Sequence, residues 1–312
     1  MTLYLHLGAH KTATTLLQNV LKHNEAALEE RGLARIKIQP RHLFWHLYRD
    51  GDRDAFKKRR RTLARKLQQY YKSWPNAVLS SETMFGTSDL HRVNCLYPRA
   101  DTALRVLAQL TSGMNRKVIF YVRRQDNFIE SSFINRLQTL ATSLHLDHAQ
   151  LLSDTTWCSF EHYLSSFTPS QLSWLHLIKR MEAHFGAENL IIRPFESIHR
   201  GNAAYAESFL APMCATHDLE LAPQVYENRS FSAKALEEFI RLAPKQGFAN
   251  LRSLRLHLQD KYPNTSYPRP MLLSPEQRQE ILQTLATENS ILFEQYFSDV
   301  DRTDISYQPV GS

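Results

Sequence analysis

The stretch that decides the fold lies near the amino terminus, and residues Leu3–Gln18 read LYLHLGAHKTATTLLQ. Its first part, Leu3–Leu7, is an apolar run of strand length that breaks at Gly8. Leucine and valine then recur at helical spacing over Leu16–Leu21. The stretch therefore predicts a buried strand, a short loop and a helix in succession.

The loop between these two elements carries groups that can bind an anion. A helix N-terminus presents unpaired N–H groups and the positive end of the helix dipole. Lys11 adds a full charge, and Thr12, Thr14 and Thr15 add hydroxyl donors. The loop is not a Walker A motif, because His10 instead of Gly precedes Lys11 and no earlier Gly fits the spacing. An anion site and an ordinary strand–turn–helix with a threonine cap both remain open on this evidence.

The composition predicts a globular, basic protein. A chain of 312 residues is long enough for one large α/β domain, which we expect to span residues 1–312. The net charge of +7 fits an anionic ligand, a nucleic acid or a membrane surface, and does not choose among them. The three cysteines show no metal spacing, and the sequence has neither a membrane-length apolar run nor a signal-peptide pattern. We therefore expect a cytoplasmic protein.

Two further features have more than one interpretation. The basic run Lys57–Arg61 lies in a helical pattern from Arg53 to Lys72. It could be a solvated helix face or a positive rim that attracts an acidic ligand, and we favour the solvated face. His42 and His46 have helical spacing but no third ligand in a known pattern, so we expect no metal site.

Two more predicted strands end in residues that can take part in chemistry. Ala77–Ser81 has the pattern of a core strand, and Glu82 follows it directly. Lys117–Val122 is the clearest strand in the chain and ends in Arg123 and Arg124. Ligands of an open parallel α/β sheet lie outside the carboxyl ends of its strands. These side chains should therefore share an edge with the loop after the first strand.

Each of these side chains also has an ordinary structural interpretation. Glu82 could cap a helix, pair with a surface lysine or act as a general base. The arginine pair could form a surface ion pair, or it could hold a phosphate with its planar fork of donors. Ser131 lies eight residues after Arg123, in a helix predicted over about 126–140, and could add a hydroxyl. Two positive charges at this strand end, with no Asp after another strong strand, disfavour a kinase or ATPase that must hold Mg²⁺ there.

The segment Lys11–Thr15 resembles the 5′-phosphosulfate loop of bacterial sulfotransferases that use 3′-phosphoadenosine 5′-phosphosulfate. Ala13 stands where that family usually has Gly, and its methyl group is harmless at negative φ but costly at positive φ. Arg123 and Ser131 resemble the family's second element, a strand-end Arg and a Ser eight residues later that together grip the 3′-phosphate. The order and spacing of the two elements make the resemblance more specific than either element alone. A looser similarity covers most of the chain.

This resemblance implies a P-loop NTPase-like sulfotransferase fold, with a parallel sheet of about five strands flanked by helices and a largely helical carboxyl-terminal half. It implies transfer of a sulfuryl group, without a metal, to a hydroxyl or amine of an acceptor such as a saccharide, a lipid or a small metabolite. Glu82 would take the acceptor proton, His10 is the second candidate for this role, and Lys11 would neutralise the leaving phosphate. The residues that would hold the co-substrate are Lys11, Thr12, Ala13, Thr14, Thr15, Arg123, Ser131 and Arg229. A P-loop nucleotide-dependent kinase and a non-catalytic polyanion-binding protein are the alternatives, and we expect no nucleic-acid partner.

Overall fold

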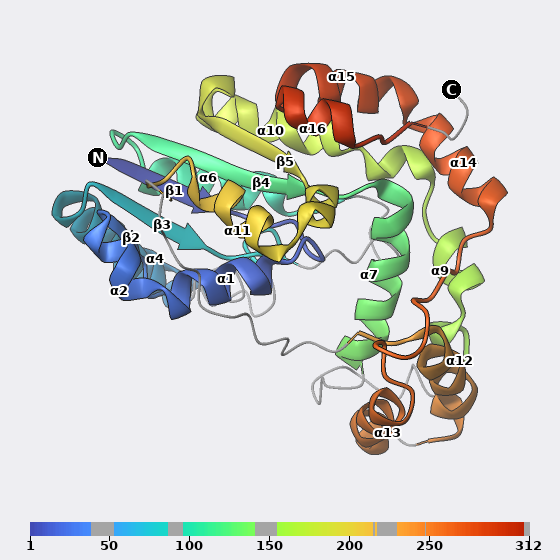
Figure 1. Cartoon of the computed structure of the whole chain (residues 1–312). Coiled ribbons are helices and arrows are strands. Elements are labelled where there is room, and N and C mark those ends of the chain that lie inside the picture. The colour runs from blue at the N-terminus through green and yellow to red at the C-terminus, as the bar shows by residue number, and fades with distance from the viewer. Residues whose placement is uncertain are drawn as a thin grey trace.

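A computed structural model describes residues 1–38, 53–86, 96–140, 155–214, 216, 230–246 and 248–308. Its centre is a sheet of five parallel strands in the order β2-β3-β1-β4-β5 (Figure 1). The strands are β1 (Thr2–His6), β2 (Leu33–Arg35), β3 (Asn76–Ser80), β4 (Arg116–Val122) and β5 (Leu190–Pro194). The predicted α/β class and the parallel sheet of about five strands are confirmed.

β1 occupies the middle of the sheet because both of its faces are apolar. Leu3 and Leu5 are fully buried in the hydrophobic cluster on one face, whereas Tyr4 belongs to the cluster on the other. This alternation follows from the period of two along a strand. Leu5 lies opposite Leu79 of β3 and Val118 of β4 in the parallel registers. The loop after β1 therefore leaves the sheet at its centre, with a strand end on either side.

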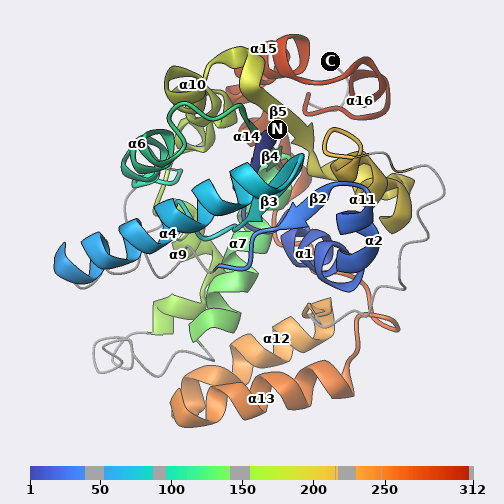
Figure 2. The same cartoon turned by 90° about the vertical axis from the view of Figure 1, so that its left-hand side faces the viewer.

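Helices cover both faces of the sheet (Figure 2). The face that Tyr4 lines is covered by α1 (Thr14–His23), α2 (Glu25–Glu30) and α11 (Asn202–Leu210). The face that Leu3 and Leu5 line is covered by α4 (Arg53–Ser73), α6 (Ala100–Leu110) and α10 (Trp174–Phe185). Each helix contributes an apolar stripe, such as Leu17, Val20 and Leu21 of α1, as helical periodicity predicts.

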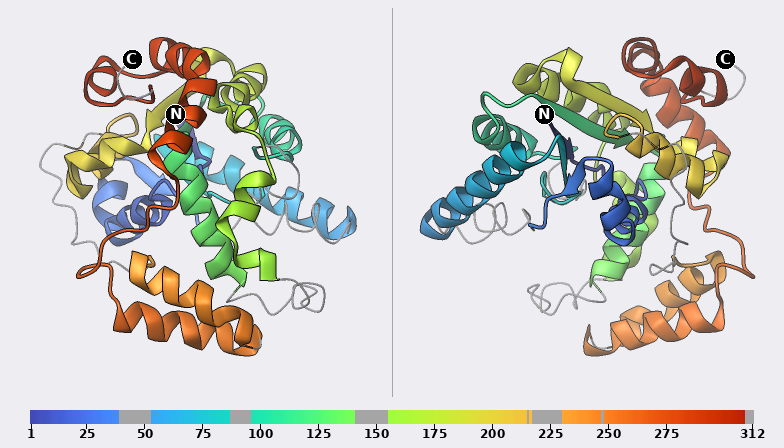
Figure 3. Two further views of the ribbon diagram at one scale, coloured as in Figure 1. Left: turned by 90° about the vertical axis from the view of Figure 1, so that its right-hand side faces the viewer. Right: turned by 60° about the vertical axis from the view of Figure 1, so that its left-hand side comes forward.

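The rest of the described chain is mostly helical, and much of it lies beyond the carboxyl edge of the sheet (Figures 1 and 3). From the end of β4, α7 (Gln125–Leu140) runs away from the sheet and contacts three helices: α9 (Phe160–Ser165), α13 (Phe248–Lys261) and α14 (Pro275–Thr284). The other helices of this half are α12 (Ala233–Leu242), α15 (Ala286–Tyr296) and α16 (Asp299–Asp304). Short 3₁₀ turns are η2 (Thr155–Cys158), η3 (Pro169–Leu172), η4 (Ala187–Asn189), η5 (Phe195–Arg200) and η6 (Ala243–Lys245). The predicted helical carboxyl-terminal half is confirmed.

The basic run Lys57–Arg61 lies mostly on the exposed side of α4, while Leu63 and Leu67 of the same helix are buried. Lys57 pairs with Asp54 of its own helix, and both side chains are well exposed. The run therefore has the surroundings of a solvated face. No helix among the residues described is both long and apolar enough to cross a bilayer.

Candidate functional site

The β1–α1 loop holds two non-glycine residues in the left-handed region of backbone space. Lys11 has a φ of 62° and Ala13 a φ of 54°, and Thr12 between them is not among the residues with positive φ. Each such residue costs roughly 1–2 kcal/mol because its Cβ crowds the following carbonyl. Such strain clusters at ligand sites, and alternating conformations of this kind turn successive N–H groups toward one side, as in an anion-binding nest. Ala13 thus adopts the conformation in which its methyl group is costly.

The threonine hydroxyls of this loop fold inward. Thr12 is fully buried, and its Oγ1 donates a hydrogen bond of 2.7 Å to the carbonyl oxygen of Ala9. Thr14 is also buried, and its Oγ1 lies 3.3 Å from the same oxygen. The hydroxyls therefore hold the loop together. α1 begins at Thr14, and the side chain of Ala13 at its N-cap provides no hydrogen bond.

Arg123 at the end of β4 reaches the β1–α1 loop. Its Nη1 donates a hydrogen bond of 2.9 Å to the carbonyl oxygen of Lys11, and its guanidinium carbon lies 4.7 Å from the ring centroid of Phe195. The indole Nε1 of Trp174 donates a hydrogen bond of 2.6 Å to the main-chain oxygen of Arg123 and fixes the end of the strand. The Nε of Arg123 is buried without a partner among the described residues. The guanidinium therefore keeps a donor to spare.

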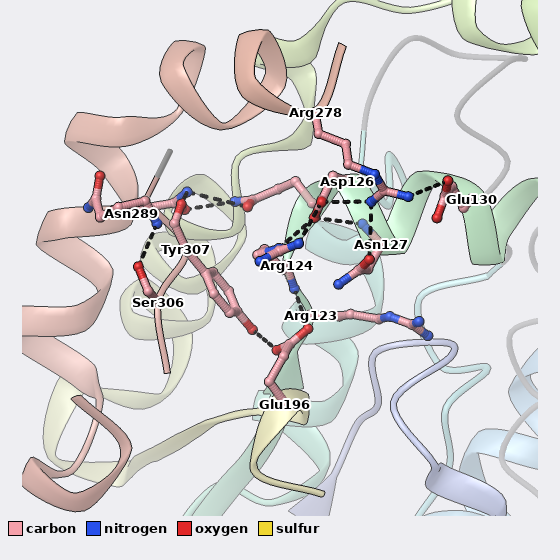
Figure 4. A network of polar contacts seen from close by, with 12 residues as sticks. Arg123, Arg124, Asp126, Asn127, Glu130, Glu196, Arg278, Asn289, Ser306 and Tyr307 are labelled. Carbon is pink, nitrogen blue, oxygen red and sulfur yellow. Dashed lines mark hydrogen bonds and ion pairs between the residues drawn. The ribbon is translucent and has the colours of Figure 1, made fainter. Parts of the chain in front are cut away.

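Arg124 has a different environment, although it is adjacent in sequence. Its Nε and Nη2 donate to both carboxylate oxygens of Asp126, at 2.8 and 2.9 Å. Arg278 of α14 also donates to Asp126, and to Glu130, at 2.9 and 2.6 Å. Figure 4 shows that Arg123 points away from this network. The Arg124 side chain is thus committed to an internal bidentate pair that joins the β4–α7 junction to α14.

A second buried contact supports the same strand end. Glu196 accepts a hydrogen bond from the main-chain N–H of Arg124 at 2.9 Å and another from the hydroxyl of Tyr307 at 2.5 Å (Figure 4). Burial raises the pKa of Glu196, and the two hydrogen bonds offset only part of this rise. The charge of Glu196 also acts on Arg123, whose pKa it raises. The carboxyl-terminal segment around Tyr307 is therefore part of the support behind Arg123.

The positive charges of Lys11 and Arg123 are poorly compensated. Burial, and then the charge of Arg123, lower the pKa of Lys11, and Glu82 opposes this shift. Burial lowers the pKa of Arg123 as well, and Arg269, in the Pro-rich segment before α14, lowers it further. Among the residues described, the ammonium of Lys11 forms neither a hydrogen bond nor an ion pair. An anion bound between these cations would remove this penalty.

Glu82 lies directly against the β1–α1 loop, on the other side from Arg123. Gly8 has a φ of 107°, and a Cβ added there would lie 3.3 Å from the Cα of Glu82. A glycine is required at this point for both the conformation and the close approach. Glu82 is half-buried, one residue beyond Ser81, whose N–H donates to the carbonyl oxygen of His6 at 2.9 Å. The close approach at Gly8 therefore places the main chain of Glu82 beside the Lys11 loop.

His10 is held by Tyr97. The main-chain N–H of His10 donates a hydrogen bond of 2.9 Å to the hydroxyl of Tyr97, and its Nδ1 lies 2.9 Å from the same hydroxyl. The two rings stack with centroids 5.6 Å apart. Burial raises the pKa of the Tyr97 hydroxyl well above its usual range, so the hydroxyl keeps its proton. That proton can be donated to Nδ1, which leaves the ring proton of a neutral His10 on Nε2.

The remaining predicted residues are not joined to the Lys11–Arg123 pair by the described contacts. Ser131 lies on α7 about 9 Å along the helix axis from its first residue. Its Oγ donates a hydrogen bond of 3.0 Å to the carbonyl oxygen of Phe128. Arg229, His42 and His46 lie outside the described residues. No group of three or more His, Cys, Asp or Glu side chains in the described ranges is arranged to hold a metal ion.

Three residues near the site were not identified from the sequence: Tyr97, Phe195 and Arg269. Arg269 lies between two prolines, and the carbonyl oxygen of Pro268 accepts a hydrogen bond of 2.8 Å from the N–H of Ala233 at the start of α12. Its position in a Pro-rich segment was the only available signal, and that signal predicts a surface loop as readily as a ligand contact.

Neither a protein-family model nor a curated protein matches this chain. Among solved structures, the chain is similar to one titled "Crystal Structure of Sulfotransferase from Alicyclobacillus acidocaldarius". The match has 12% sequence identity and a TM-score of 0.43, and it covers 96% of this chain and 98% of that chain.

Proposed function

We propose that this protein transfers a sulfuryl group from 3′-phosphoadenosine 5′-phosphosulfate to a hydroxyl or amine of an acceptor. The observation that carries the proposal is the meeting of Lys11 and Arg123, from two motifs about 110 residues apart, at one edge of the sheet. Both are half-buried cations with lowered pKa values and with donors to spare. In this proposal the two cations bind the two phosphate-bearing ends of one ligand.

In this proposal the main-chain N–H groups after Lys11 and the start of α1 hold the 5′ phosphosulfate. The inward-turned hydroxyls of Thr12 and Thr14 keep the loop in that shape. Ala13 and Thr15, at the first helical turn, would contribute their main-chain N–H groups. Arg123 holds the 3′-phosphate, and Ser131 and Arg229 stay as proposed additional contacts. Arg269 is a further cation that could join them.

The reaction itself is a displacement at sulfur. The acceptor oxygen or nitrogen forms a bond to sulfur while the bond from sulfur to the phosphate oxygen breaks, and that oxygen keeps the electron pair. Lys11 stabilises the charge that develops on the leaving phosphate oxygen, and the acceptor proton passes to a base. In-line positioning and charge stabilisation supply most of the rate in related phosphoryl chemistry.

Glu82 is our preferred base. Its main chain abuts Gly8 and its charge acts on Lys11, which supports a carboxylate near the reacting end of the donor. His10 is less suited to this role. The Tyr97 hydroxyl accepts its main-chain N–H and can donate its own proton to Nδ1, which favours the ring proton on Nε2. A neutral His10 of that form is a hydrogen-bond donor at Nε2 and cannot accept a proton there.

A P-loop kinase remains the second candidate, because one observation favours it. Glu82 follows β3, the strand next to β1, and is thus an acidic residue at the edge where Mg²⁺ is held in nucleotide kinases. The absence of an Asp after another strong strand is therefore weaker evidence against a kinase. Against a kinase, the hydroxyl that follows the loop lysine should bind Mg²⁺, whereas Thr12 is buried and donates to Ala9.

A non-catalytic polyanion-binding role has less support. The basic run Lys57–Arg61 lies on α4, which packs on the face of the sheet opposite α1. A protein that only binds polyanions would use such exposed charges, and it would not need half-buried cations in a strained loop. Sulfuryl transfer should depend on Lys11, whereas polyanion binding should depend on the exposed run Lys57–Arg61.

The test is a transfer assay with donor labelled at sulfur and a panel of acceptor saccharides, lipids and small metabolites. We expect the wild type to label at least one acceptor without added metal. Lys11→Ala should lower transfer about 10²–10³-fold, whereas the exposed control Lys57→Ala should transfer normally. Transfer of phosphate from ATP only with Mg²⁺ would instead support the kinase, and equal transfer by both variants would contradict the role of Lys11.

A further inference from the structure

A pocket of about 310 Å³ opens beside α1 where β2 and β3 end. Its lining comes from α1, from the end of β2 and from the residues that follow β3, and it includes Gln18, Lys22, Arg35, Ser81, Glu82 and Thr83. Ligand pockets in proteins start at about this volume, so it suits a molecule of the size of one sugar unit.

Most of the lining can form hydrogen bonds, and the internal contacts fix these groups in place. Gln18 Nε2 lies 3.5 Å from the carbonyl oxygen of Ser80, and Ser80 Oγ lies 2.8 Å from Nδ1 of the buried His6. The hydroxyls of Ser81 and Thr83 lie 3.4 Å apart. Amides and hydroxyls both donate and accept, which matches a ligand with several hydroxyl groups.

The pocket also carries a surplus of positive charge on one side. Lys22 and Arg35 line it, and the only carboxylate in the lining is Glu82. Arg35 donates from Nη2 to Glu25 at 3.2 Å, but Lys37 pairs with Glu25 as well, at 2.6 Å. The Nε of Arg35 is buried and has no partner among the described residues. One glutamate shared by two cations leaves capacity for an anionic group on a ligand.

Glu82 connects the pocket to the Lys11 loop. It lines the pocket, its main chain abuts Gly8, and its charge acts on Lys11. A hydroxyl group that meets Glu82 from this pocket therefore lies at the edge where Lys11 and Arg123 meet.

We propose that this pocket binds the acceptor, and that the acceptor is a sugar-sized polyhydroxyl compound with a carboxylate or phosphate group that Lys22 and Arg35 bind. This inference rests on the proposed sulfuryl transfer. The acceptor hydroxyl oxygen would form its bond to sulfur as the donor's bond between sulfur and phosphate oxygen breaks, and the hydroxyl proton would pass to Glu82. The adenosine 3′,5′-bisphosphate that leaves carries the electron pair of the broken bond.

The test uses calorimetric titration of the full chain with three probes: glucuronate, glucose 6-phosphate and glucose. The titrations are made with and without saturating adenosine 3′,5′-bisphosphate, which occupies the Lys11–Arg123 site so that the probes cannot bind there. We expect glucuronate or glucose 6-phosphate to bind at least about tenfold more tightly than glucose, since the anionic group adds a charge-assisted hydrogen bond that glucose cannot form. Which of the two binds better identifies the anionic group.

Lys22→Ala and Arg35→Gln should each weaken binding of the preferred probe about tenfold, and Lys57→Ala, a matched exposed cation elsewhere, should not change it. Because Lys22 is exposed, its variant should fold even if Arg35→Gln does not. Absence of binding by both anionic probes, or equal binding in Lys22→Ala and Lys57→Ala, overturns the pocket assignment. The bisphosphate titration reports separately on the proposed function: if the bisphosphate binds and the probes do not, only the pocket assignment is wrong.

Discussion

Replacement of Arg123 by alanine should weaken the binding of adenosine 3′,5′-bisphosphate strongly while leaving the fold intact. The side chain donates one hydrogen bond, to the carbonyl oxygen of Lys11, and stacks on Phe195. Its buried Nε has no partner among the described residues, so the guanidinium can meet a phosphate without giving up a contact. The variant removes the charged partner of that phosphate.

The expected loss follows from these contacts. A hydrogen bond to a charged group contributes about 1.5–3 kcal/mol, and removal of one partner of a buried charge pair costs about 2–5 kcal/mol. We expect about 2–4 kcal/mol for Arg123→Ala, which is a rise of about 30- to 900-fold in the dissociation constant. Arg123→Lys keeps the charge and loses the planar fork, so it should fall between the alanine variant and the wild type.

Isothermal titration calorimetry measures the affinity, and Arg124→Ala is the matched control. Arg124 donates from Nε and Nη2 to Asp126, so Arg124→Ala should lower the midpoint of urea unfolding and leave bisphosphate affinity nearly unchanged. A dissociation constant for Arg123→Ala within about threefold of the wild type, together with a large loss for Arg124→Ala, would refute the assignment within the pair.

Three further predictions concern the base, the loop and a buried histidine. Glu82→Gln should lower turnover about 10²–10⁴-fold and leave bisphosphate affinity unchanged in steady-state and titration assays; turnover within about threefold of wild type would exclude Glu82 as the base. Ala13→Gly should stabilise the protein by about 0.5–1 kcal/mol in urea unfolding, because glycine adopts the φ of 54° without a Cβ penalty; a loss of stability would contradict the left-handed conformation. Burial lowers the pKa of His6 to about 3, so the folded protein loses stability as the pH falls from about 6.5 toward 3, where only the unfolded chain takes up the proton. The free energy of unfolding, measured with urea, should be about 2 kcal/mol lower at pH 5 than at pH 7 from this effect, and His6→Phe should not show this part of the loss. An equal pH dependence in both proteins would contradict the buried neutral ring.

Much of the fold could be predicted from the sequence because its signals are local. The apolar runs of β1 and β4 are long enough to mark buried strands, and the helical stripe of α1 follows within the same stretch. The edge of the sheet at which the site should lie follows from the parallel arrangement of the strands. Lys11, Glu82 and Arg123 were therefore predicted to lie at one edge, and their described contacts agree with that arrangement.

The finer features depend on residues that are distant in sequence. Which arginine faces the loop is decided by contacts from distant elements: Asp126 accepts from the Arg124 side chain, and Glu196 accepts from the Arg124 main-chain N–H. Arg278 of α14 holds the same Asp126 in place. No local pattern encodes that choice. The positive φ of Ala13 and the inward hydroxyl of Thr12 depend on how the loop closes over β1, and the tautomer of His10 depends on Tyr97. These features can be read only once the chain is folded.

The measurement that tests the central claim most directly is a pair of calorimetric titrations of the wild-type chain. One uses adenosine 3′,5′-bisphosphate without metal, and the other uses ATP with Mg²⁺. If Lys11 and Arg123 hold the two phosphate groups of one ligand, as we propose, the bisphosphate should bind tightly without metal. ATP should bind more weakly, because the Thr12 hydroxyl that would bind Mg²⁺ donates to Ala9 instead. ATP that binds as tightly as the bisphosphate, and only with Mg²⁺, would contradict the account.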